Sequence, residues 1–333
     1  MKINQKKINF EKIRSTYKLK NQIYSCFGYI FLFVSIFITL GFVFWIIATI
    51  IFKGIPNFHF WMLWTDYNPN DLHNSGVFPF LVTTFMLLFF TLLIAIPLAI
   101  IFALCLSEYL NKKKKKKILF VLNVFNSIPS LIIGIFGLWL FIFVLNITSN
   151  GFSILAAGLT MVFVVLPILT IGFYESFTKV PKIQKTSFLA LGAKKYQLIF
   201  KIILPSCKNN LLSIVFLAMI RILGETAPTI LTIGGSYFTP HSILDQGRTL
   251  SALIYLLFSE SNDPFAQNFG YTAIFILIFF IIILNICQKG IIKYSNISEW
   301  KNLKNKSIVF LSLLKTFFKI FWHIFKSPKK KIN

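Results

Sequence analysis

VFPFLVTTFMLLFFTLLIAIPLAIIFALCLS, residues 77–107, contains no charged side chain. A helix needs about 20 apolar residues to cross the roughly 30 Å hydrocarbon core of a membrane, and this segment exceeds that length. Its apolar residues are continuous rather than alternating, which is typical of a membrane helix and not of a barrel strand. The segment therefore predicts a membrane-spanning helix.

Five further apolar runs flank this segment, and the whole chain shares its composition. The chain is 56% hydrophobic and 13% charged, with a mean hydropathy of +0.75, outside the usual range of soluble domains. We expect an all-α polytopic membrane protein with six transmembrane helices. The predicted spans are 26–52, 77–107, 118–145, 152–174, 209–234 and 270–288. Kinks are expected in the second to fifth spans, at Pro97, Pro129, Pro167 and Pro228.

The basic residues are distributed unevenly around these spans. Of 34 Lys and Arg residues, 7 precede Tyr24, 6 lie in 111–117, 7 lie in 175–208 and 11 follow from Lys289 onward. All four segments fall on one side of a six-span arrangement, so the positive-inside rule places both termini in the cytoplasm. The net charge of +24 thus indicates topology and attraction to anionic membrane lipid, not a nucleic-acid partner.

The sequence offers little for enzyme chemistry. The four cysteines are isolated, the histidines are scattered, and no nucleophile–base pair or metal-ligand spacing is present. We expect no catalytic residues, metal or cofactor. The chain also lacks GxxxxGK[ST], so any ATP that drives it would be hydrolysed by another polypeptide.

The C-terminal segment 307–326 is apolar but carries Lys315, Lys319 and Lys326 on one helical face. A seventh span would bury two of these charges. We therefore predict a helix that lies in the membrane interface within a basic cytoplasmic tail.

Span five contains ionised residues far from either end of its apolar run. Arg221 lies 12 residues into 209–234, which predicts a position near mid-membrane, and Glu225 follows at i+4 on the same face. A charge at the bilayer centre costs about 2.5–3.5 kcal/mol even on insertion scales, so an ionised residue at this depth indicates a structural or functional role. Two interpretations remain open: a structural ion pair between helices, or an arginine that attracts an anion in a pathway.

Span three begins with polar residues beside a proline. Ser127 and Ser130 flank Pro129, with Asn126 just before them. Their side chains either line a polar pathway or bond the helix carbonyls that the proline leaves free.

The basic segment 182–203 lies between spans four and five. Its apolar residues suit short helices interrupted at Leu191-Gly192-Ala193, since glycine fits a turn between helices, and Pro205 is expected to end the segment. It is either an ordinary interfacial loop or a docking surface for a cytoplasmic partner.

This segment resembles the EAA loop of type I ABC importer permeases, because Gly192, Ile202 and Leu204-Pro205 have its spacing. In that family the loop forms a coupling helix that inserts into a groove of a cytoplasmic ATPase. Thr186-Ser187-Phe188 stands where the family has Glu-Ala-Ala, so contacts of that glutamate are not carried over. The resemblance assigns ATPase coupling to Leu191, Gly192, Ala193, Ile202, Leu204 and Pro205.

Other segments resemble phosphate permeases of the PstA type in particular. RILGETAPTIL, from Arg221, is similar to their RALGETAP segment, whereas the sister PstC type usually reads RAIGETM. NSIPSLIIGIFGLWLF, from Asn126, looks like their third helix. The resemblance covers roughly residues 76–289 and implies a MetI-like permease core of five helices there, with the coupling loop at 180–205. The flanking regions are a cytoplasmic N-terminus, a first span with its external loop, and a basic tail, at 1–22, 23–75 and 290–333.

The resemblance implies an ATP-driven phosphate importer in a bacterial inner membrane. It implies a homologous PstC-type permease, a PstB-type ATPase dimer and a PstS-type extracytoplasmic binding protein as partners. The substrate pathway would include Arg221, Glu225, Ser127 and Ser130. Two alternatives are a permease for another oxyanion or polar solute, and a membrane scaffold that senses phosphate without transporting it.

Overall fold

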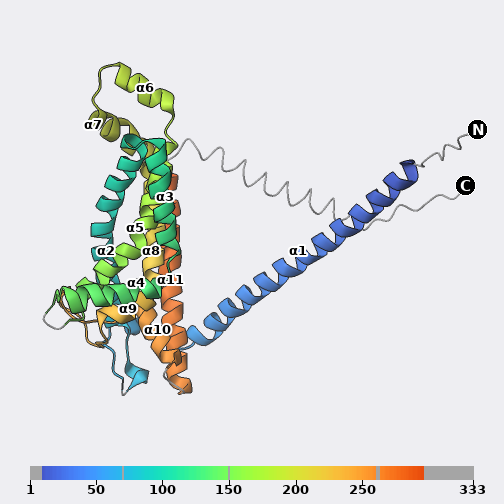
Figure 1. Cartoon of the computed structure of the whole chain (residues 1–333). Coiled ribbons are helices and arrows are strands. Elements are labelled where there is room, and N and C mark those ends of the chain that lie inside the picture. The colour runs from blue at the N-terminus through green and yellow to red at the C-terminus, as the bar shows by residue number, and fades with distance from the viewer. Residues whose placement is uncertain (1–9, 70, 149–150, 260–262, 296–333) are drawn as a thin grey trace, which may run out of the picture.

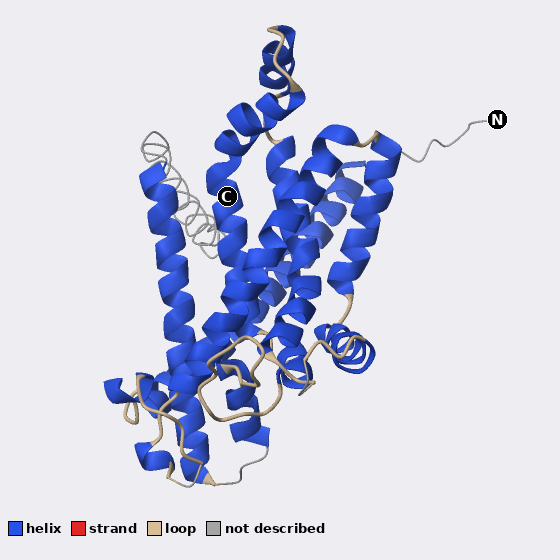
Figure 2. Ribbon diagram, turned by 90° about the vertical axis from the view of Figure 1, so that its left-hand side faces the viewer, coloured by secondary structure: helices blue, strands red, loops and turns tan. Residues whose placement is uncertain are grey.

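The computed structural model describes residues 10–69, 71–148, 151–259 and 263–295. Within these ranges every regular element is a helix, which agrees with the predicted all-α class (Figure 2). In chain order the elements are α1 (Phe10–Gly54), η1 (Phe60–Leu63), η2 (Leu72–Asn74), α2 (Phe78–Leu104), η3 (Cys105–Tyr109), α3 (Lys112–Ser127), α4 (Ser130–Gly137), η4 (Leu138–Val144), α5 (Ile154–Thr178), α6 (Lys182–Ala190), α7 (Lys195–Leu198), η5 (Ile199–Ile203), α8 (Leu204–Gly224), α9 (Ala227–Ile233), α10 (Leu250–Ser259) and α11 (Pro264–Ser295).

Helices α2 and α5 form the centre of the bundle, and α8 packs against α5. Small residues allow this close packing: Ala95, Ala99 and Ala103 of α2 are fully buried, and Gly158 of α5 lies directly against the ring of Phe90. The rest of the main core is aliphatic and aromatic, with fully buried Phe173 and Phe177 toward the end of α5. The bundle therefore places the C-terminal ends of α2 and α5 beside each other and beside the start of α8.

Five helices in the described ranges are long and apolar enough to cross a membrane. They are Gly28–Gly54, Phe78–Tyr109, Ile154–Thr178, Lys195–Gly224 and Pro264–Ile292. A sixth span exists only if Lys112–Ser127 and Ser130–Val144 are counted as one, although they meet at 91°. The expected single helix over 118–145 is thus two helices at nearly a right angle. Because Pro129 disfavours the helical conformation of the residue before it, Ile128 is extended, with ψ 130°.

The four prolines of the predicted spans behave in two ways. Pro97 and Pro167 lie inside α2 and α5, as expected of kinks. Pro129 and Pro228 instead stand at the starts of α4 and α9, after a break in the helix. Hydropathy alone therefore predicted spans three and five as single helices, whereas each consists of two helices separated by a break.

Two of the lysine-rich segments, 111–117 and 182–201, lie at one end of the bundle (Figure 1). Helices α6, α7 and the beginning of α3, which includes Lys112–Lys117, lie there, while η1, η2 and the segment 234–249 lie at the opposite end. Helix α1 diverges from the bundle and meets α11 near Gly54, whose carbonyl accepts a hydrogen bond from Thr272 Oγ1 at 3.3 Å. The predicted interfacial helix at 307–326 lies outside the described residues.

Candidate functional site

The central feature of the site is a break in span five. Helix α8 ends at Gly224, Glu225 is extended (ψ 128°), and α9 begins at Ala227. Pro228 explains the break, because its ring would clash with the carbonyl four residues earlier, that of Gly224. Arg221 therefore lies in the last turn of α8 and not midway along a continuous helix, which corrects the expectation for 209–234.

The predicted pair of Arg221 and Glu225 is present at this break. Arg221 Nε lies 3.3 Å from Glu225 Oε1, and the two side chains are 32% and 16% exposed. The pairing is not a well-directed hydrogen bond, since the buried Nε has no hydrogen-bond partner. Among the described residues the other guanidinium nitrogens of Arg221 also have none. The cation is thus neutralised by a carboxylate but keeps donors available for an incoming oxyanion.

Hydroxyl groups from α9 and α10 support the break. Ser251 Oγ donates to the Glu225 carbonyl at 3.0 Å, and Thr229 Oγ1 donates to the Thr226 carbonyl at 2.8 Å. Thr249 Oγ1 lies 3.1 Å from Ser251 Oγ and 3.4 Å from Thr229 Oγ1. All three hydroxyl side chains are buried. The Glu225 carbonyl accepts from Ser251 and, at 3.4 Å, from Thr229 Oγ1, so these two hydroxyls fix the backbone of Glu225, and the Thr226 carbonyl also accepts from the Ile230 N–H.

The break in span three lies next to α9. A Cβ added at Gly134 of α4 would stand only 2.9 Å from Pro228 Cα, so α4 and α9 are in backbone contact (Figure 1). Ser127 Oγ donates to Asn123 O within its own helix at 2.9 Å, a carbonyl four residues before Ser127 and not the one that Pro129 leaves free. Ser130 is half-buried and has no hydrogen bond in the described part of the chain. No described contact joins either serine to Arg221.

The predicted loop consists of α6, a turn, and α7. Gly192 in the turn has φ +83°, a conformation that favours glycine, and Leu191 beside it is 85% exposed. Ala193 is half-buried in the same turn. The structure thus places Leu191, Gly192 and Ala193 at the tip of the loop, apart from the bundle (Figure 1).

The second half of the loop is part of a long helix. Lys195–Gly224 is one helix with a π-helical section at η5, and Ile202 and Leu204 pack half-buried against the core. Pro205 is the second residue of α8 and follows directly on η5, so it lies inside the long helix where the π-helical section already alters the hydrogen-bond pattern. The expectation that Pro205 ends the segment is therefore wrong.

Thr186, Ser187 and Phe188 stand where the family has Glu-Ala-Ala, and the described contacts of Thr186 and Phe188 are as follows. Thr186 Oγ1 donates to the carbonyls of Lys182 and Ile183, at 3.0 and 3.1 Å. Phe188 packs partly buried against the core. Lys185, one of the lysines of this basic segment, directs its ammonium inward and forms an ion pair with Glu108.

A second arginine lies at the opposite end of the bundle from the α6–α7 loop. The guanidinium of Arg248 lies 4.0 Å from the centroid of the Tyr237 ring, and its Nη2 donates to Gly235 O at 2.9 Å. Tyr237 in turn stacks on Tyr67 with ring centroids 5.2 Å apart. Burial, followed by the neighbouring Tyr237, raises the pKa of Tyr67, so its phenol is neutral at physiological pH.

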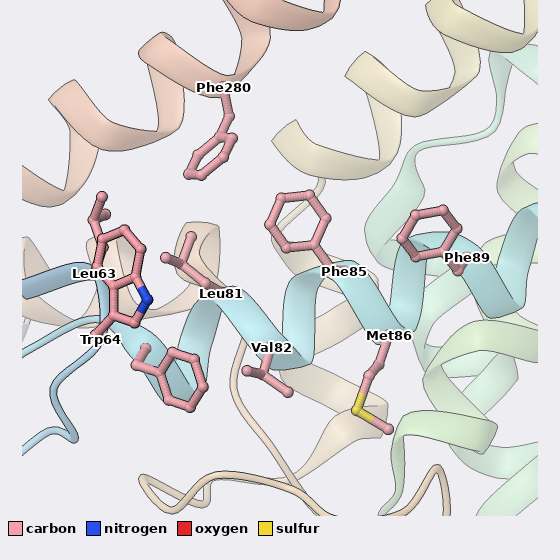
Figure 3. A pocket seen from close by; sticks show the side chains of 9 residues that line it. Leu63, Trp64, Leu81, Val82, Phe85, Met86, Phe89 and Phe280 are labelled. Carbon is pink, nitrogen blue, oxygen red and sulfur yellow. The ribbon is translucent and has the colours of Figure 1, made fainter.

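One hollow on the flank of α2 contains none of the predicted site residues. Figure 3 shows apolar side chains around it, from η1, α2 and α11. They include Trp64, Phe85, Phe89 and Phe280. Such a lining has no group that would select a polar solute, so the hollow is separate from the site at the α8–α9 break.

The chain matches the family model described as "Binding-protein-dependent transport system inner membrane component" over residues 95–296. It is 30% identical to the "Probable phosphate transport system permease protein PstA" of Methanocaldococcus jannaschii, over 73% of this chain and 85% of that protein. The PstA homolog of Mycoplasma pneumoniae is 31% identical over 68% of this chain, which spans 36% of that longer relative. The Xylella fastidiosa strain 9a5c protein named PstA is 27% identical over 72% of this chain and 82% of its own length.

Solved ABC transporters share the fold. An inward-facing structure of the methionine transporter MetNI superposes with a TM-score of 0.52 at 18% identity, covering 66% of this chain and 94% of that one. A bacterial alginate transporter, solved with a periplasmic protein bound to alginate pentasaccharide, gives 0.55 at 15% identity, covering 88% and 97%. This chain therefore belongs to the family of binding-protein-dependent transport system inner membrane components, the permeases of type I ABC importers.

Proposed function

We propose that this chain is the PstA-type permease subunit of an ATP-driven importer of inorganic phosphate. The observation that carries the proposal is Arg221, a cation at a helix break whose remaining guanidinium donors have no described partner. Phosphate is an anion with several acceptor oxygens, which a guanidinium can hold with two parallel hydrogen bonds. The relatives in Methanocaldococcus jannaschii and Xylella fastidiosa are named as phosphate transport system permease proteins, which supports this substrate.

The composition of the site favours transient binding. Glu225 balances the charge of Arg221, so an incoming oxyanion meets a single, partly neutralised cation. A transport pathway must release what it takes up, which requires a weak site. We infer that affinity resides in a separate extracytoplasmic binding protein of the PstS type, and that Arg221 and Glu225 act as a low-affinity gate. Ser127 and Ser130 would line the approach.

The α6–α7 loop supports the proposed partners. The loop exposes apolar side chains, with Leu191 at its tip 85% and Ile183 near the start of α6 78% exposed, although it lies at the end of the bundle rich in lysine. Burying these side chains in a groove of a PstB-type ATPase would remove them from water. Gly192 keeps the tip sharp, and Ile202, Leu204 and Pro205 connect it to α8. The other half of the pathway would be a PstC-type permease.

The proposed topology places the α6–α7 loop on the cytoplasmic side. The position of the lysine-rich segments 111–117 and 182–201 at one end of the bundle, together with the basic sequence of the two terminal segments, supports a bacterial inner-membrane protein with both termini in the cytoplasm. Closure of the ATPase dimer would then move the α6–α7 loop and alternate access to the site.

The test is phosphate uptake by proteoliposomes that contain this chain with its second permease and ATPase, supplied with phosphate-loaded binding protein. We expect ATP-dependent accumulation of phosphate that excess sulfate or methionine does not reduce. Competition by another oxyanion would assign the chain to that substrate instead. Absence of any flux in a complex that still hydrolyses ATP would overturn the transport proposal and favour a sensing scaffold.

A further inference from the structure

A short ion pair ties the α6–α7 loop to the bundle. Lys185 Nζ of α6 lies 2.6 Å from Glu108 Oε1 of η3, and each side chain is 15% exposed. The same ammonium donates to Phe177 O, near the end of α5, at 3.1 Å. A single side chain of the loop therefore contacts the C-terminal ends of both α2 and α5, the two central helices of the bundle.

The turn that carries Glu108 receives two further lysines. Lys195 Nζ of α7 lies 4.7 Å from the centroid of the Tyr109 ring. Lys115 Nζ of α3 donates to Ser107 O at 3.3 Å. Three helices thus direct cations at η3, but Lys185 is the partner of the carboxylate.

Helix α6 has few other attachments. None of its residues is buried, and Phe188 is the residue that packs partly against the core. The ion pair with Glu108 consequently contributes a large share of what holds α6 in place. Removing one member of a largely buried pair leaves the other charge without compensation, which is more costly than losing an exposed pair.

The loop is connected to the permease core along the chain, to α5 before α6 and to α8 after α7, and through side-chain contacts. After α7 the loop continues through η5 into α8, as one helix that ends at Gly224 and carries Arg221 in its last turn. Through Lys185 it contacts η3 and α5. The ion pair joins α6 to the helix Phe78–Tyr109, and without it the loop would keep only the weaker described contact of Lys195 with Tyr109.

We propose that Glu108 and Lys185 are positioning residues for energy coupling: their ion pair makes α2 move with α5 and α6 when the ATPase moves the loop. The inference rests on the proposed function, since it presumes an ATPase that acts on this loop. It adds a residue pair whose members are 77 positions apart in sequence and which contacts neither the proposed substrate nor the exposed tip.

The experiment measures ATP hydrolysed per phosphate imported in proteoliposomes of the complete complex. Glu108→Gln and Lys185→Gln should each raise this ratio by about tenfold, within the range for residues that carry coupling between sites. The exchange Glu108→Lys with Lys185→Glu should return the ratio to within about twofold of the original protein, because the pair is re-formed with reversed polarity. A purely structural role would lower abundance and both activities together, without changing the ratio.

Lys182→Gln is the matched control. Lys182 lies on the same helix, its side chain is exposed and forms no described ion pair, and its neutralisation should leave the ratio unchanged. An unchanged ratio in both single variants, or failure of the exchange to restore it, overturns the proposal. If the neutral variants do not assemble, Glu108→Asp shortens the acid by one methylene with its charge kept, and an unchanged ratio there also overturns it. Failure of the original complex to import phosphate would refute the proposed function instead.

Discussion

Two arginines of this permease, Arg221 and Arg248, differ in the groups that stabilise their partly buried guanidinium cations. Each has one buried guanidinium nitrogen without a hydrogen-bond partner, Nε in Arg221 and Nη1 in Arg248. Arg221 is balanced by a carboxylate 3.3 Å away. Arg248 has no ion pair among the described residues and is held by the face of Tyr237 and the carbonyl of Gly235.

The difference indicates which arginine is suited to bind an anion reversibly. Arg248 is fixed by a ring and a carbonyl, so its role is to hold the 234–248 loop against the aromatic cluster of Tyr237 and Tyr67. Arg221 has a single ionic neighbour and free donors at a helix end. The following variants test this division of roles.

The largest effect is expected for Arg221→Ala. Phosphate uptake should fall by about a hundredfold, because charge-assisted hydrogen bonds to the oxyanion are lost, while assembly with the ATPase remains. Uptake and co-purification are measured on the same membranes. If Arg221→Ala instead loses abundance and adding Glu225→Ala restores it, the pair is structural and the anion role is refuted.

Glu225→Gln should lower maximal uptake by about tenfold and also lower the phosphate concentration for half-maximal rate. The uncompensated cation of Arg221 would hold the anion more strongly and release it more slowly. Initial uptake rates over a range of phosphate concentrations separate the two effects. A higher half-saturating concentration would contradict this role of Glu225.

Ser251→Ala tests the support of the break. Loss of the hydrogen bond to the Glu225 carbonyl should cost about 1 kcal/mol of stability and reduce uptake by about fivefold. Thermal unfolding of the purified complex measures the first and uptake the second. Ser251→Thr keeps a hydroxyl and is the control; equal loss in both variants would show that packing, not the hydrogen bond, matters.

The smallest effect is expected for Arg248→Lys. A lysine retains the charge over Tyr237 but loses the planar contact, so uptake should change by no more than about twofold. Arg221→Lys is the matched substitution and should reduce uptake by about tenfold, since the bidentate geometry is lost. Equal losses at the two positions would remove the distinction between the arginines.

The apolar runs were sufficient to predict the main helices but not their breaks. The ranges 77–107 and 152–174 match α2 with η3, and α5, to within a few residues, because continuous hydrophobicity requires helical backbone in a membrane. A proline does not by itself distinguish a kink from a break: Pro97 remains inside a helix, whereas Pro228 follows one that has ended.

The site was predictable where its residues are close in sequence. Arg221 and Glu225 are four residues apart, so they stay in contact although the helix ends at Gly224 between them. The hydroxyl of Ser251 is 26 residues from the Glu225 carbonyl, and Glu108 is 77 residues from Lys185. Such contacts depend on how helices pack, which a single sequence does not specify.

The π-helical turns η3 and η5 have a consequence for how the bundle could move. Both lie at the end of the bundle where the α6–α7 loop is: η3 is the last turn of the helix Phe78–Tyr109, and η5 lies between α7 and α8 within Lys195–Gly224. A π-turn contains one more residue than an α-turn, with weaker hydrogen-bond geometry, and such turns are frequent at functional sites. If a π-turn becomes an α-turn, the extra residue moves into the neighbouring turn. The side chains of α2 or α8 can in this way shift by one position along the helix while the helix stays folded.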